Sequence, residues 1–394
     1  MGSADVSIGF VSTYPPTVCG LATYTESLLG AIARDRGNRS GLGVVDVGHG
    51  KRGVDARRGV HRLLGGDGRS LHRAAQVLNT YDTVSIQHEF GIFPGPDGED
   101  VLELMGALTV PTAVTFHTVL DDPTPHQRAI IDQLALEADR LVVMSTTGAT
   151  RLASGYGIDP DRIDVVAHGA NSLLGGPSLA SGDRRLVLTW GLIGPGKGLD
   201  SAIQAFGELL DLEPAPRYLI AGATHPHVRE SSGESYRRSL GALAHGLGLD
   251  HVVEFDGRYF DRVSLARLVR SADVVMLPYS STEQVTSGVL AEAIAAGKPV
   301  VATRFPHAVE LLTGGAGLTA PQGDAHALAE ALRLVLTDHE ARARMGREAR
   351  RLAASWFWPT IGRRFTGMMS EMAAAGGRVG VRADSRPELF RAVG

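Results

Sequence analysis

The chain has 394 residues, of which 43% are hydrophobic and 21% are charged, and its formal net charge at pH 7 is −4. This length predicts two domains, and the acidic balance excludes the basic field that nucleic-acid binding needs. The single cysteine, Cys19, excludes a disulfide framework, and no apolar run approaches the ~18 residues of a membrane span. We therefore expect a cytoplasmic protein with at most peripheral membrane contact and no nucleic-acid partner.

In the first half of the chain, short apolar runs alternate with segments of helical periodicity. The predicted strands are residues 6–12, 41–48, 83–88, 112–117, 140–145 and 162–168. The predicted helices are residues 21–35, 69–79, 100–108, 126–138 and 147–157. Apolar strands separated by helices predict a parallel sheet that is covered on both faces.

A Gly-, Ser- and Pro-rich segment with little periodicity, residues 169–184, interrupts this alternation and favours a linker. Beyond it the alternation restarts. The predicted strands there are residues 185–191, 217–222, 252–257, 273–279 and 299–304. The predicted helices are residues 198–211, 236–248, 261–272, 287–297, 325–338 and 339–358, the last with a solvated Arg-rich face.

The fold class that follows is α/β, with two Rossmann-like, doubly wound domains in series. The predicted organisation is an N-terminal domain (1–172), a linker (173–184), a C-terminal domain (185–355), a helix that returns to the N-terminal domain (356–375) and a tail (376–394). Nucleotides bind such folds at the carboxyl ends of the strands, so we expect the site in a cleft between the two domains.

Two glycine-rich segments approach known nucleotide-binding motifs. "GHGKRG" (48–53) has the glycine spacing of the dinucleotide fingerprint, but no helix pattern follows it, which favours a surface loop. "GLIGPGKG" (191–198) nearly matches the phosphate loop of P-loop NTPases, but Gly198 lacks the hydroxyl that would bind magnesium. Lys197, at the start of a predicted helix, is still a reasonable phosphate-binding residue.

Several short motifs occur in an order that resembles one known family. The motifs are "VSTYPPTVCGLATYTESLL" (11–29), "TFHTV" (115–119), "RIDVVAHGAN" (162–171), "TWGLIGPGKGLDSAIQAF" (189–206), "YLIAG" (218–222), "LVRSADVVMLPY" (268–279) and "LAEAIAAGKPVVAT" (290–303). They resemble the retaining glycosyltransferases of family four, which have the GT-B fold of two Rossmann-like domains facing a central cleft. The first half is then the acceptor side, the second half binds the nucleotide-sugar donor, and the match ends near residue 365.

In the donor half, the resemblance implies that Lys197 contacts the leaving diphosphate and that Glu292 binds the ribose hydroxyls. The family's first glutamate lies eight positions earlier, where this chain has Gln284, which implies a branch that reads the transferred sugar with an amide. Leu192 stands where the family often has arginine, so Arg258 is the candidate for the missing phosphate contact. The remaining donor-binding candidates are Glu283, Thr286, Ser287, Gly288 and Tyr259.

In the first half, the resemblance implies that His117 helps to position sugar and acceptor, with a core histidine as the alternative. It also implies that Gly20 and Leu21 present backbone amides to the diphosphate. Three polar residues end a buried strand, so we assign them to the acceptor pocket: Gln87, His88 and Glu89. Cys19 is expected to be a loop cysteine, because no partner base for a nucleophile is indicated.

The function that these residues favour is transfer of a hexose, such as mannose or glucose, from a GDP- or UDP-hexose to an acceptor hydroxyl. The resemblance implies retention of configuration and a front-face mechanism that the leaving diphosphate assists, with no metal ion and no cofactor. The acceptor is a carbohydrate, a lipid-linked molecule or a small molecule, and a homodimer is compatible with the sequence. Two alternatives stay open, namely a catalytically silent nucleotide-sugar binding protein and another GT-B enzyme such as a sugar-nucleotide epimerase.

Overall fold

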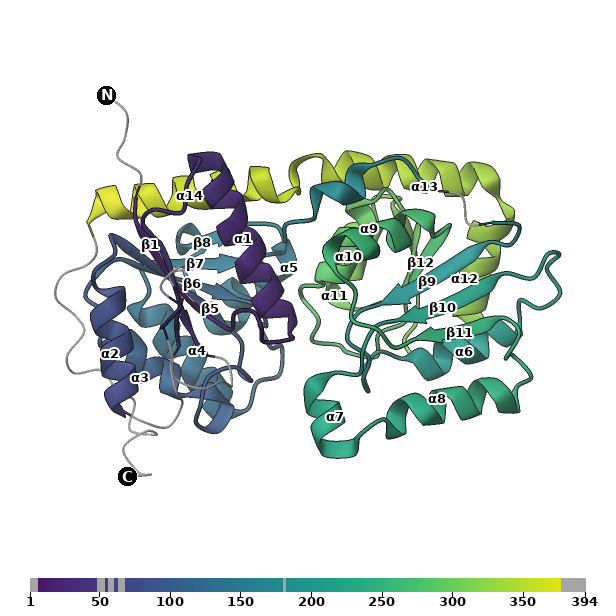
Figure 1. Cartoon of the computed structure of the whole chain (residues 1–394), viewed down its shortest axis with the longest axis horizontal. Helices are drawn as coiled ribbons and strands as arrows, with labels where there is room; N and C mark the ends of the chain where they lie inside the picture. Colours follow the sequence, from purple (N-terminus) through teal and green to yellow (C-terminus); the bar gives the residue numbers. More distant parts are fainter. Residues whose placement is uncertain (1–5, 48–53, 56–59, 63–67, 180–181, 377–394) are drawn as a thin grey trace. The chain divides into compact units, whose positions relative to one another are not determined.

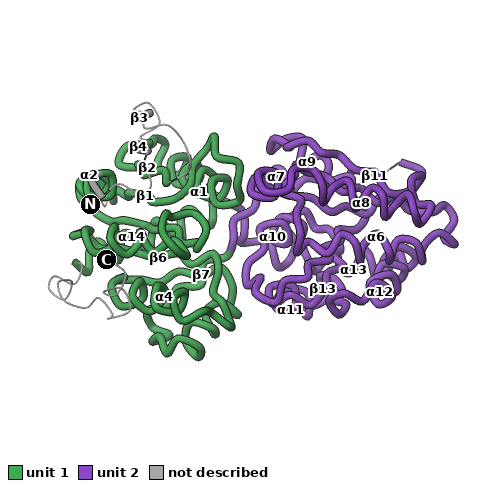
Figure 2. The backbone as a smooth tube through the Cα atoms, turned by 90° about the horizontal axis from the view of Figure 1, so that it is seen from below, with its two compact units in different colours: residues 1–167, 358–394 green, residues 168–357 purple. Residues whose placement is uncertain are grey.

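The structure, a computed structural model, describes residues 6–47, 54–55, 60–62, 68–179 and 182–376. The chain divides into two compact units (Figure 2). Unit 1 combines residues 1–167 with 358–394, and unit 2 consists of residues 168–357. The fingerprint-like segment 48–53 and the tail from 377 onward lie outside the described residues.

Unit 1 is built on a sheet of eight strands in the order β3-β4-β2-β1-β5-β6-β7-β8 (Figure 1). Among the described strands, β3 and β4 pair antiparallel and every other neighbouring pair is parallel. The strands are β1 (Ile8–Ser12), β2 (Leu42–Asp46), β3 (Val54–Asp55), β4 (Val60–Arg62), β5 (Thr83–His88), β6 (Thr112–Phe116), β7 (Arg140–Val143) and β8 (Ile163–Val165). The helices are α1 (Gly20–Arg36), α2 (Gly68–Leu78), α3 (Asp100–Gly106), α4 (Pro125–Glu137), α5 (Thr146–Thr150) and α14 (Trp358–Ala375), with short turns at η1 (Pro96–Gly98), η2 (Arg151–Gly155) and η3 (Pro160–Arg162).

Helix α14 belongs to unit 1, where it packs against α1 (Figure 1). Phe365 stacks on Phe10 of β1 with 5.9 Å between the ring centroids. A Cβ at Gly362 would lie 2.9 Å from the Cβ of Ala31, so glycine allows the two helices to approach closely. Buried apolar residues recur along α14 at helical spacing: Trp358, Ile361, Phe365, Met368, Met369 and Met372.

Unit 2 is built on a parallel sheet of six strands in the order β11-β10-β9-β12-β13-β14 (Figure 1). This is the doubly wound order in which the direction of winding reverses between the first and fourth strands of the domain. The strands are β9 (Leu186–Trp190), β10 (Arg217–Ala221), β11 (Val253–Asp256), β12 (Val274–Leu277), β13 (Val300–Thr303) and β14 (Gly317–Ala320). The helices are α6 (Leu199–Gly207), α7 (Pro226–Ser232), α8 (Ser235–Gly246), α9 (Arg262–Ser271), α10 (Gly288–Ala295), α11 (Pro306–Leu312), α12 (Ala325–Thr337) and α13 (His339–Leu352), with short turns at η4 (Ser172–Gly175) and η5 (Ala353–Ser355).

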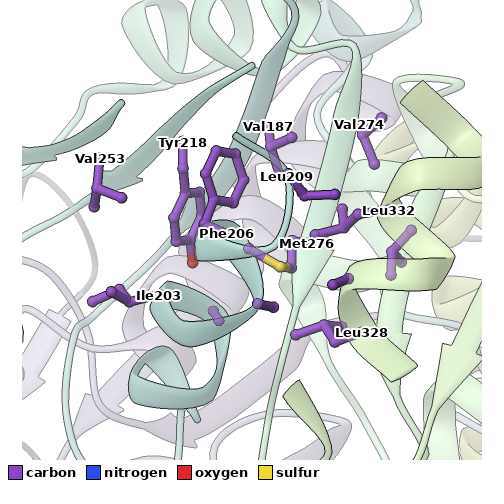
Figure 3. Packing of buried hydrophobic residues seen from close by; sticks show 14 of the residues in the cluster. Val187, Ile203, Phe206, Leu209, Tyr218, Val253, Val274, Met276, Leu328 and Leu332 are labelled. Atoms are coloured by element: carbon purple, nitrogen blue, oxygen red, sulfur yellow. The ribbon is translucent and has the colours of Figure 1, made fainter. Parts of the chain in front are cut away.

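The two faces of the unit 2 sheet carry separate apolar cores. Successive residues of a strand point to opposite faces, so Val187 of β9 joins one core and Leu188 joins the other. In the first core, Phe206 of α6 stacks on Tyr218 of β10 with 5.1 Å between the ring centroids (Figure 3). Because both faces are buried, the strands read as continuous apolar runs in the sequence.

The structure places residues 168–172 in unit 2, whereas the sequence assigned them to the N-terminal domain. The physical reason is a backbone hydrogen bond from Ala170 N to Trp356 O (2.8 Å), which ties this segment to the end of unit 2. The predicted linker also begins with a 3-10 turn (Ser172–Gly175) in which Leu174 is buried. The first residues of the predicted linker are therefore ordered and packed against unit 2.

Among the described strands and α-helices, five do not match a segment predicted from the sequence: β3, β4, α7, α11 and β14. All are short, and β14 contains Gly317, which weakens its strand signal. A Cβ at Gly317 would lie 2.1 Å from the carbonyl oxygen of Val300 on the neighbouring strand, so the close approach of β13 and β14 requires glycine. Within the described residues, no helix combines the length and apolar character that crossing a bilayer requires.

Candidate active site

Most of the donor-binding candidates of unit 2 lie in segments that follow the strands where the strand order of its sheet reverses. Strands β9 and β12 are neighbours, and each is followed at its carboxyl end by one candidate segment. The turn 191–198 follows β9 and leads into α6, and the segment 278–287 follows β12 and leads into α10. The two segments are joined directly, because the backbone N–H of Ser280 donates to the carbonyl oxygen of Gly196 (3.0 Å).

Lys197 lies in the turn before α6, against an aromatic ring from the other segment. Its Nζ lies 4.0 Å from the centroid of the Tyr279 ring, close enough for a cation–π interaction. Tyr279 is buried and stacks in turn on Phe305, with 4.9 Å between the centroids. The Lys197 ammonium group is therefore held over a fixed platform at the start of a helix, where anions are favoured.

The glycine that follows Lys197 explains the incomplete phosphate-loop motif. Gly198 has φ +60° and precedes the first residue of α6. A Cβ on Gly198 would lie 1.8 Å from the carbonyl oxygen of Pro278, which rules out a serine or threonine in this backbone. The magnesium-binding hydroxyl of a P-loop has no room in this turn, so the structure agrees with the rejection of that motif.

Side chains cap the N-terminus of α10 and contact it from two other elements. The Ser287 hydroxyl accepts from the backbone N–H of Leu290 (3.2 Å), as an N-cap serine does. The Ser287 N–H itself donates to Nδ1 of His307, a buried residue of α11 (2.9 Å). A Cβ on Gly288 would lie 2.8 Å from Nε2 of His168, so glycine is required where this ring meets the helix.

Glu292 lies in the second turn of α10, half-buried against the end of β9. Its Oε2 accepts a long hydrogen bond from the indole Nε1 of Trp190 (3.4 Å). Burial raises the pKa of the Glu292 carboxyl to about 7, while the Trp190 hydrogen bond and the charge of Arg262 act in the opposite direction. Near pH 7 the neutral and charged forms are therefore both populated, and an added hydrogen-bond donor would favour the charged form.

Gln284 has a local role in the segment before α10. Its side-chain Nε2 donates to the carbonyl oxygen of Thr286 (2.6 Å), and its backbone carbonyl oxygen accepts from the backbone N–H of His307 (3.2 Å). The amide therefore fixes the shape of the segment, a role that the resemblance did not imply. A glutamate could not make the first bond, since an ionised carboxylate has no donor.

We predict that Gln284→Glu destabilises unit 2 by about 1–2 kcal/mol at pH 7, because a carboxylate would face the Thr286 carbonyl without a proton between them. Gln284→Met is the matched control, since it removes the donor without adding charge, and it should cost about 1 kcal/mol. Urea unfolding midpoints of the three proteins measure the difference. Equal midpoints for the wild type and the Glu variant would show that the amide does not hold the segment.

The other predicted donor residues divide between the segment before α10 and the rim of the domain. Glu283 and Thr286 belong to that segment, where Glu283 N donates to the Ser281 hydroxyl (3.2 Å). Arg258 is 76% exposed and its guanidinium pairs with Asp256 (2.6 Å), so its role as the phosphate contact that Leu192 lacks stays a prediction. Tyr259 beside it is also exposed.

In unit 1, His117 belongs to a polar network at the carboxyl ends of β5 and β6. Its Nε2 lies 2.9 Å from Oε1 of Gln87, whose amide nitrogen donates to the hydroxyls of Ser85 (2.9 Å) and Thr115 (3.4 Å). Because the Gln87 oxygen can only accept, Nε2 of His117 carries the proton. The ring also meets Tyr24 of α1 edge-on, with 4.9 Å between the centroids. His117 is thus half-buried and oriented from two sides.

The assignment of His88 to an acceptor pocket is not supported by its surroundings. The side chain is fully buried, and neither ring nitrogen has a hydrogen-bond partner among the described residues. Its ring lies against three aromatic residues, Phe90, Phe93 and Phe116. Burial lowers the pKa of His88 to about 3, so the ring is a neutral part of the core.

The two neighbours of His88 in the predicted acceptor set differ from each other. Gln87 is buried and serves the His117 network described above. Glu89 is half-buried, and its carboxylate accepts from the Thr118 hydroxyl (2.5 Å) and from the backbone N–H of Phe90 (3.1 Å). Burial raises the pKa of Glu89, against the effect of these two hydrogen bonds. Of the three predicted residues, Glu89 is the one that is not fully buried.

The segment that connects β1 to α1 ends at the N-terminus of α1, where Cys19 is the N-cap. Its Sγ accepts from the backbone N–H of Ala22 (3.4 Å) and lies 3.1 Å from the Thr13 hydroxyl. This capping role agrees with a loop cysteine and not with a nucleophile. Gly20 and Leu21 occupy the first two positions of the helix, whose amides have no acceptor within the helix. A Cβ on Gly20 would meet no atom of the described residues within 4 Å.

The sequence did not indicate five residues that lie near Lys197 or near α10 and the residues just before it: His168, Trp190, Arg262, Tyr279 and His307. Four of them lie at or shortly after the carboxyl end of a strand, which was the available signal. Arg262 instead opens α9. Among the described residues, no group of three or more His, Cys, Asp or Glu side chains could hold a metal ion.

Solved structures with the same architecture define the fold. Sucrose-phosphate synthase from Thermosynechococcus elongatus aligns with a TM-score of 0.75 at 19% identity, over 93% of this chain and 99% of that one. Anabaena HepE in complex with UDP aligns with a TM-score of 0.73 at 18% identity, over 93% of this chain and 100% of that one. The fold is therefore GT-B with two Rossmann-like sheets, which confirms the predicted fold class.

Sequence relatives define the enzyme class more closely. Residues 176–352 match the model of the family described as glycosyl transferases group 1. The D-inositol 3-phosphate glycosyltransferase of Corynebacterium efficiens is 32% identical over 293 residues, which are 68% of this chain and 67% of that protein. The protein of the same name from Corynebacterium glutamicum is 30% identical over 271 residues, 64% of this chain and 62% of that protein. The chain belongs to the glycosyl transferases group 1 family, and by this membership it is a transferase enzyme.

Proposed function

We propose that this chain transfers a hexosyl residue from a nucleoside diphosphate sugar to an acceptor hydroxyl, with retention of configuration and without a metal ion. The observation that carries the proposal is the meeting of two segments at the strand reversal of unit 2. Lys197 and the N-terminal turn of α10 follow the neighbouring strands β9 and β12, and the Ser280–Gly196 hydrogen bond joins the two segments. A cation and a helix N-terminus at one edge of a parallel sheet suit a diphosphate.

In the proposed reaction, the diphosphate is the leaving group and gains negative charge as its bond to the anomeric carbon breaks. Lys197 and the amides of α10 stabilise that charge. An oxygen of the departing diphosphate removes the proton of the acceptor hydroxyl, and the new glycosidic bond forms on the same face of the sugar. His117 helps to orient sugar and acceptor, and Glu292 binds the ribose diol, for which a carboxylate has two acceptor atoms.

The names of similar proteins guide the choice of substrates. The sequence relatives are glycosyltransferases of D-inositol 3-phosphate, and HepE was solved with UDP and with UDP-glucose. We therefore propose UDP- and GDP-hexoses as the first donors and polyol or hexose phosphates as the first acceptors. A lipid-linked acceptor is a second class to be tested.

The test is a matrix of UDP- and GDP-hexoses against inositol phosphates, hexose phosphates and lipid extracts, with diphosphate release as the readout. We expect one donor to be consumed only when an acceptor is present, in EDTA as well as in buffer. NMR of the product should show the anomeric configuration of the donor. Tight nucleotide-sugar binding without turnover on any acceptor would instead favour a silent binding protein, and inversion or loss in EDTA would reject the proposed mechanism.

A further inference from the structure

His307 ties both ends of the four-residue segment that precedes α10. It is the second residue of α11, and its side chain is buried, with 3% of the residue exposed. Its backbone N–H donates to the carbonyl oxygen of Gln284 (3.2 Å), and its Nδ1 accepts from the backbone N–H of Ser287 (2.9 Å). One residue that follows β13 therefore sets the shape of a segment that follows β12.

The second of these bonds fixes the protonation state of His307. An amide N–H can only donate, so Nδ1 must carry a lone pair, and the neutral ring holds its proton on Nε2. Burial lowers the pKa of His307 to about 4, with the charge of Glu310 opposing this shift and His168 adding to it. The acceptor is thus available throughout the neutral pH range.

At the N-terminus of α10, three backbone N–H groups already have acceptors, and one of these acceptors is His307. The Leu290 N–H is used by the Ser287 hydroxyl, and the Ala291 N–H by the Ser287 carbonyl oxygen. The Ser287 N–H is used by His307. The helix therefore presents the adjacent amides of Gly288 and Val289, which as its first two residues have no acceptor within it.

A second histidine, His168, restricts which residue can occupy position 288. Nε2 of His168 lies 2.8 Å from the place a Cβ on Gly288 would take, and its Nδ1 lies 2.8 Å from the carbonyl oxygen of Gly169. Since that carbonyl can only accept, Nδ1 of His168 holds the proton. The ring leaves room for glycine alone at position 288, the residue that follows the Ser287 amide bound by His307.

We propose that His307 is a positioning residue of the donor site, which binds the Ser287 amide and so directs the Gly288 and Val289 amides toward the diphosphate of a nucleotide sugar. This inference rests on the function proposed above. It assigns to His307 a role in donor affinity that acts through the α10 turn, without contact between the imidazole and the donor.

The test compares three substitutions at position 307 for binding of UDP and GDP by calorimetry and for the KM of the donor. His307→Asn places an amide oxygen near the position of Nδ1 and can accept from Ser287, whereas His307→Gln carries its oxygen farther out and His307→Leu has no acceptor. We expect the Asn variant to stay within about threefold of the wild type. The Gln and Leu variants should bind the nucleoside diphosphate about tenfold more weakly, with kcat changed less than KM.

Equal nucleotide affinity in the Asn and Gln variants would overturn the proposal, even if both are less stable than the wild type. If the Leu variant does not fold, the nucleotide affinities of the Asn and Gln variants are sufficient for the test. Both side chains are polar, and they differ in the position of the hydrogen-bond acceptor. A wild type that binds neither UDP nor GDP and consumes no nucleotide sugar would reject the proposed function together with this inference. A wild type that binds while all three variants match it would reject this inference only.

Discussion

Replacing Lys197 with methionine is expected to lower kcat by about 10²–10³-fold, the usual effect of removing one group that stabilises developing negative charge. Methionine keeps the length and apolar stem of the side chain, so its packing over Tyr279 should survive while the charge is lost. The donor KM should rise less than kcat falls, because the diphosphate carries more charge in the transition state than in the ground state. Initial rates of diphosphate release measure both constants.

Two control variants separate charge from packing at this position. Lys197→Arg keeps the charge and should retain more activity than the methionine variant, and Tyr279→Phe keeps the ring beneath the ammonium group and should be close to the wild type. The titration of His225 gives a readout that does not depend on turnover. The pKa of His225 is lowered by burial and, to a smaller extent, by the charges of His227 and Lys197. Removing the Lys197 charge should raise that pKa in an NMR titration. Near-normal turnover in the methionine variant would refute the diphosphate role of Lys197.

The central strands of both sheets could be predicted from the sequence because they are buried on both faces. Such strands are short continuous apolar runs between helices, and the predicted segments 217–222 and 299–304 correspond to β10 (Arg217–Ala221) and β13 (Val300–Thr303). The short edge strand β14 gives no such signal. It depends on the approach of Gly317 to the Val300 carbonyl, a contact that only the folded sheet creates.

The contacts that shape the α10 turn could not be predicted, because their partners are distant in sequence. Trp190 reaches Glu292 across 102 residues, and His307 reaches Ser287 across 20. A resemblance assigns roles to positions in a motif, but it says nothing of which backbone groups the surrounding side chains already use. The hydrogen bond of Gln284 to Thr286 spans only two residues, but the resemblance assigned the amide to the transferred sugar and not to this backbone carbonyl.

His88 shows the opposite error, in which a polar residue was assigned to a pocket that it does not line. The reasoning was that a buried strand seldom ends in polar residues without a function. In the structure the ring lies among aromatic side chains from its own loop and from β6, and it is neutral. A neutral imidazole can therefore replace an apolar side chain in a core, although its two nitrogens have no hydrogen-bond partner in the described part of the chain.

Gly198→Ser should destabilise unit 2 by about 3 kcal/mol or more and abolish transfer, although it completes the letters of a phosphate-loop motif. The added Cβ would lie 1.8 Å from the Pro278 carbonyl oxygen, and the backbone at φ +60° disfavours serine. Relief of the overlap must move either the segment after β12 or the turn that carries Lys197. Urea unfolding, donor turnover and ATP hydrolysis measured together test this expectation.

Gly196→Ala is the matched control, because it lies in the same turn and also has a positive φ (+87°), but a Cβ there would meet no atom within 4 Å. Its cost should be only the backbone strain, about 1–2 kcal/mol, with transfer largely kept. The difference between the two variants isolates the overlap with Pro278 from the strain of a left-handed residue. Stable folding and retained transfer in the serine variant, or ATP hydrolysis gained by it, would mean that the turn can open to accept a hydroxyl and that the distinction from P-loop enzymes is not steric.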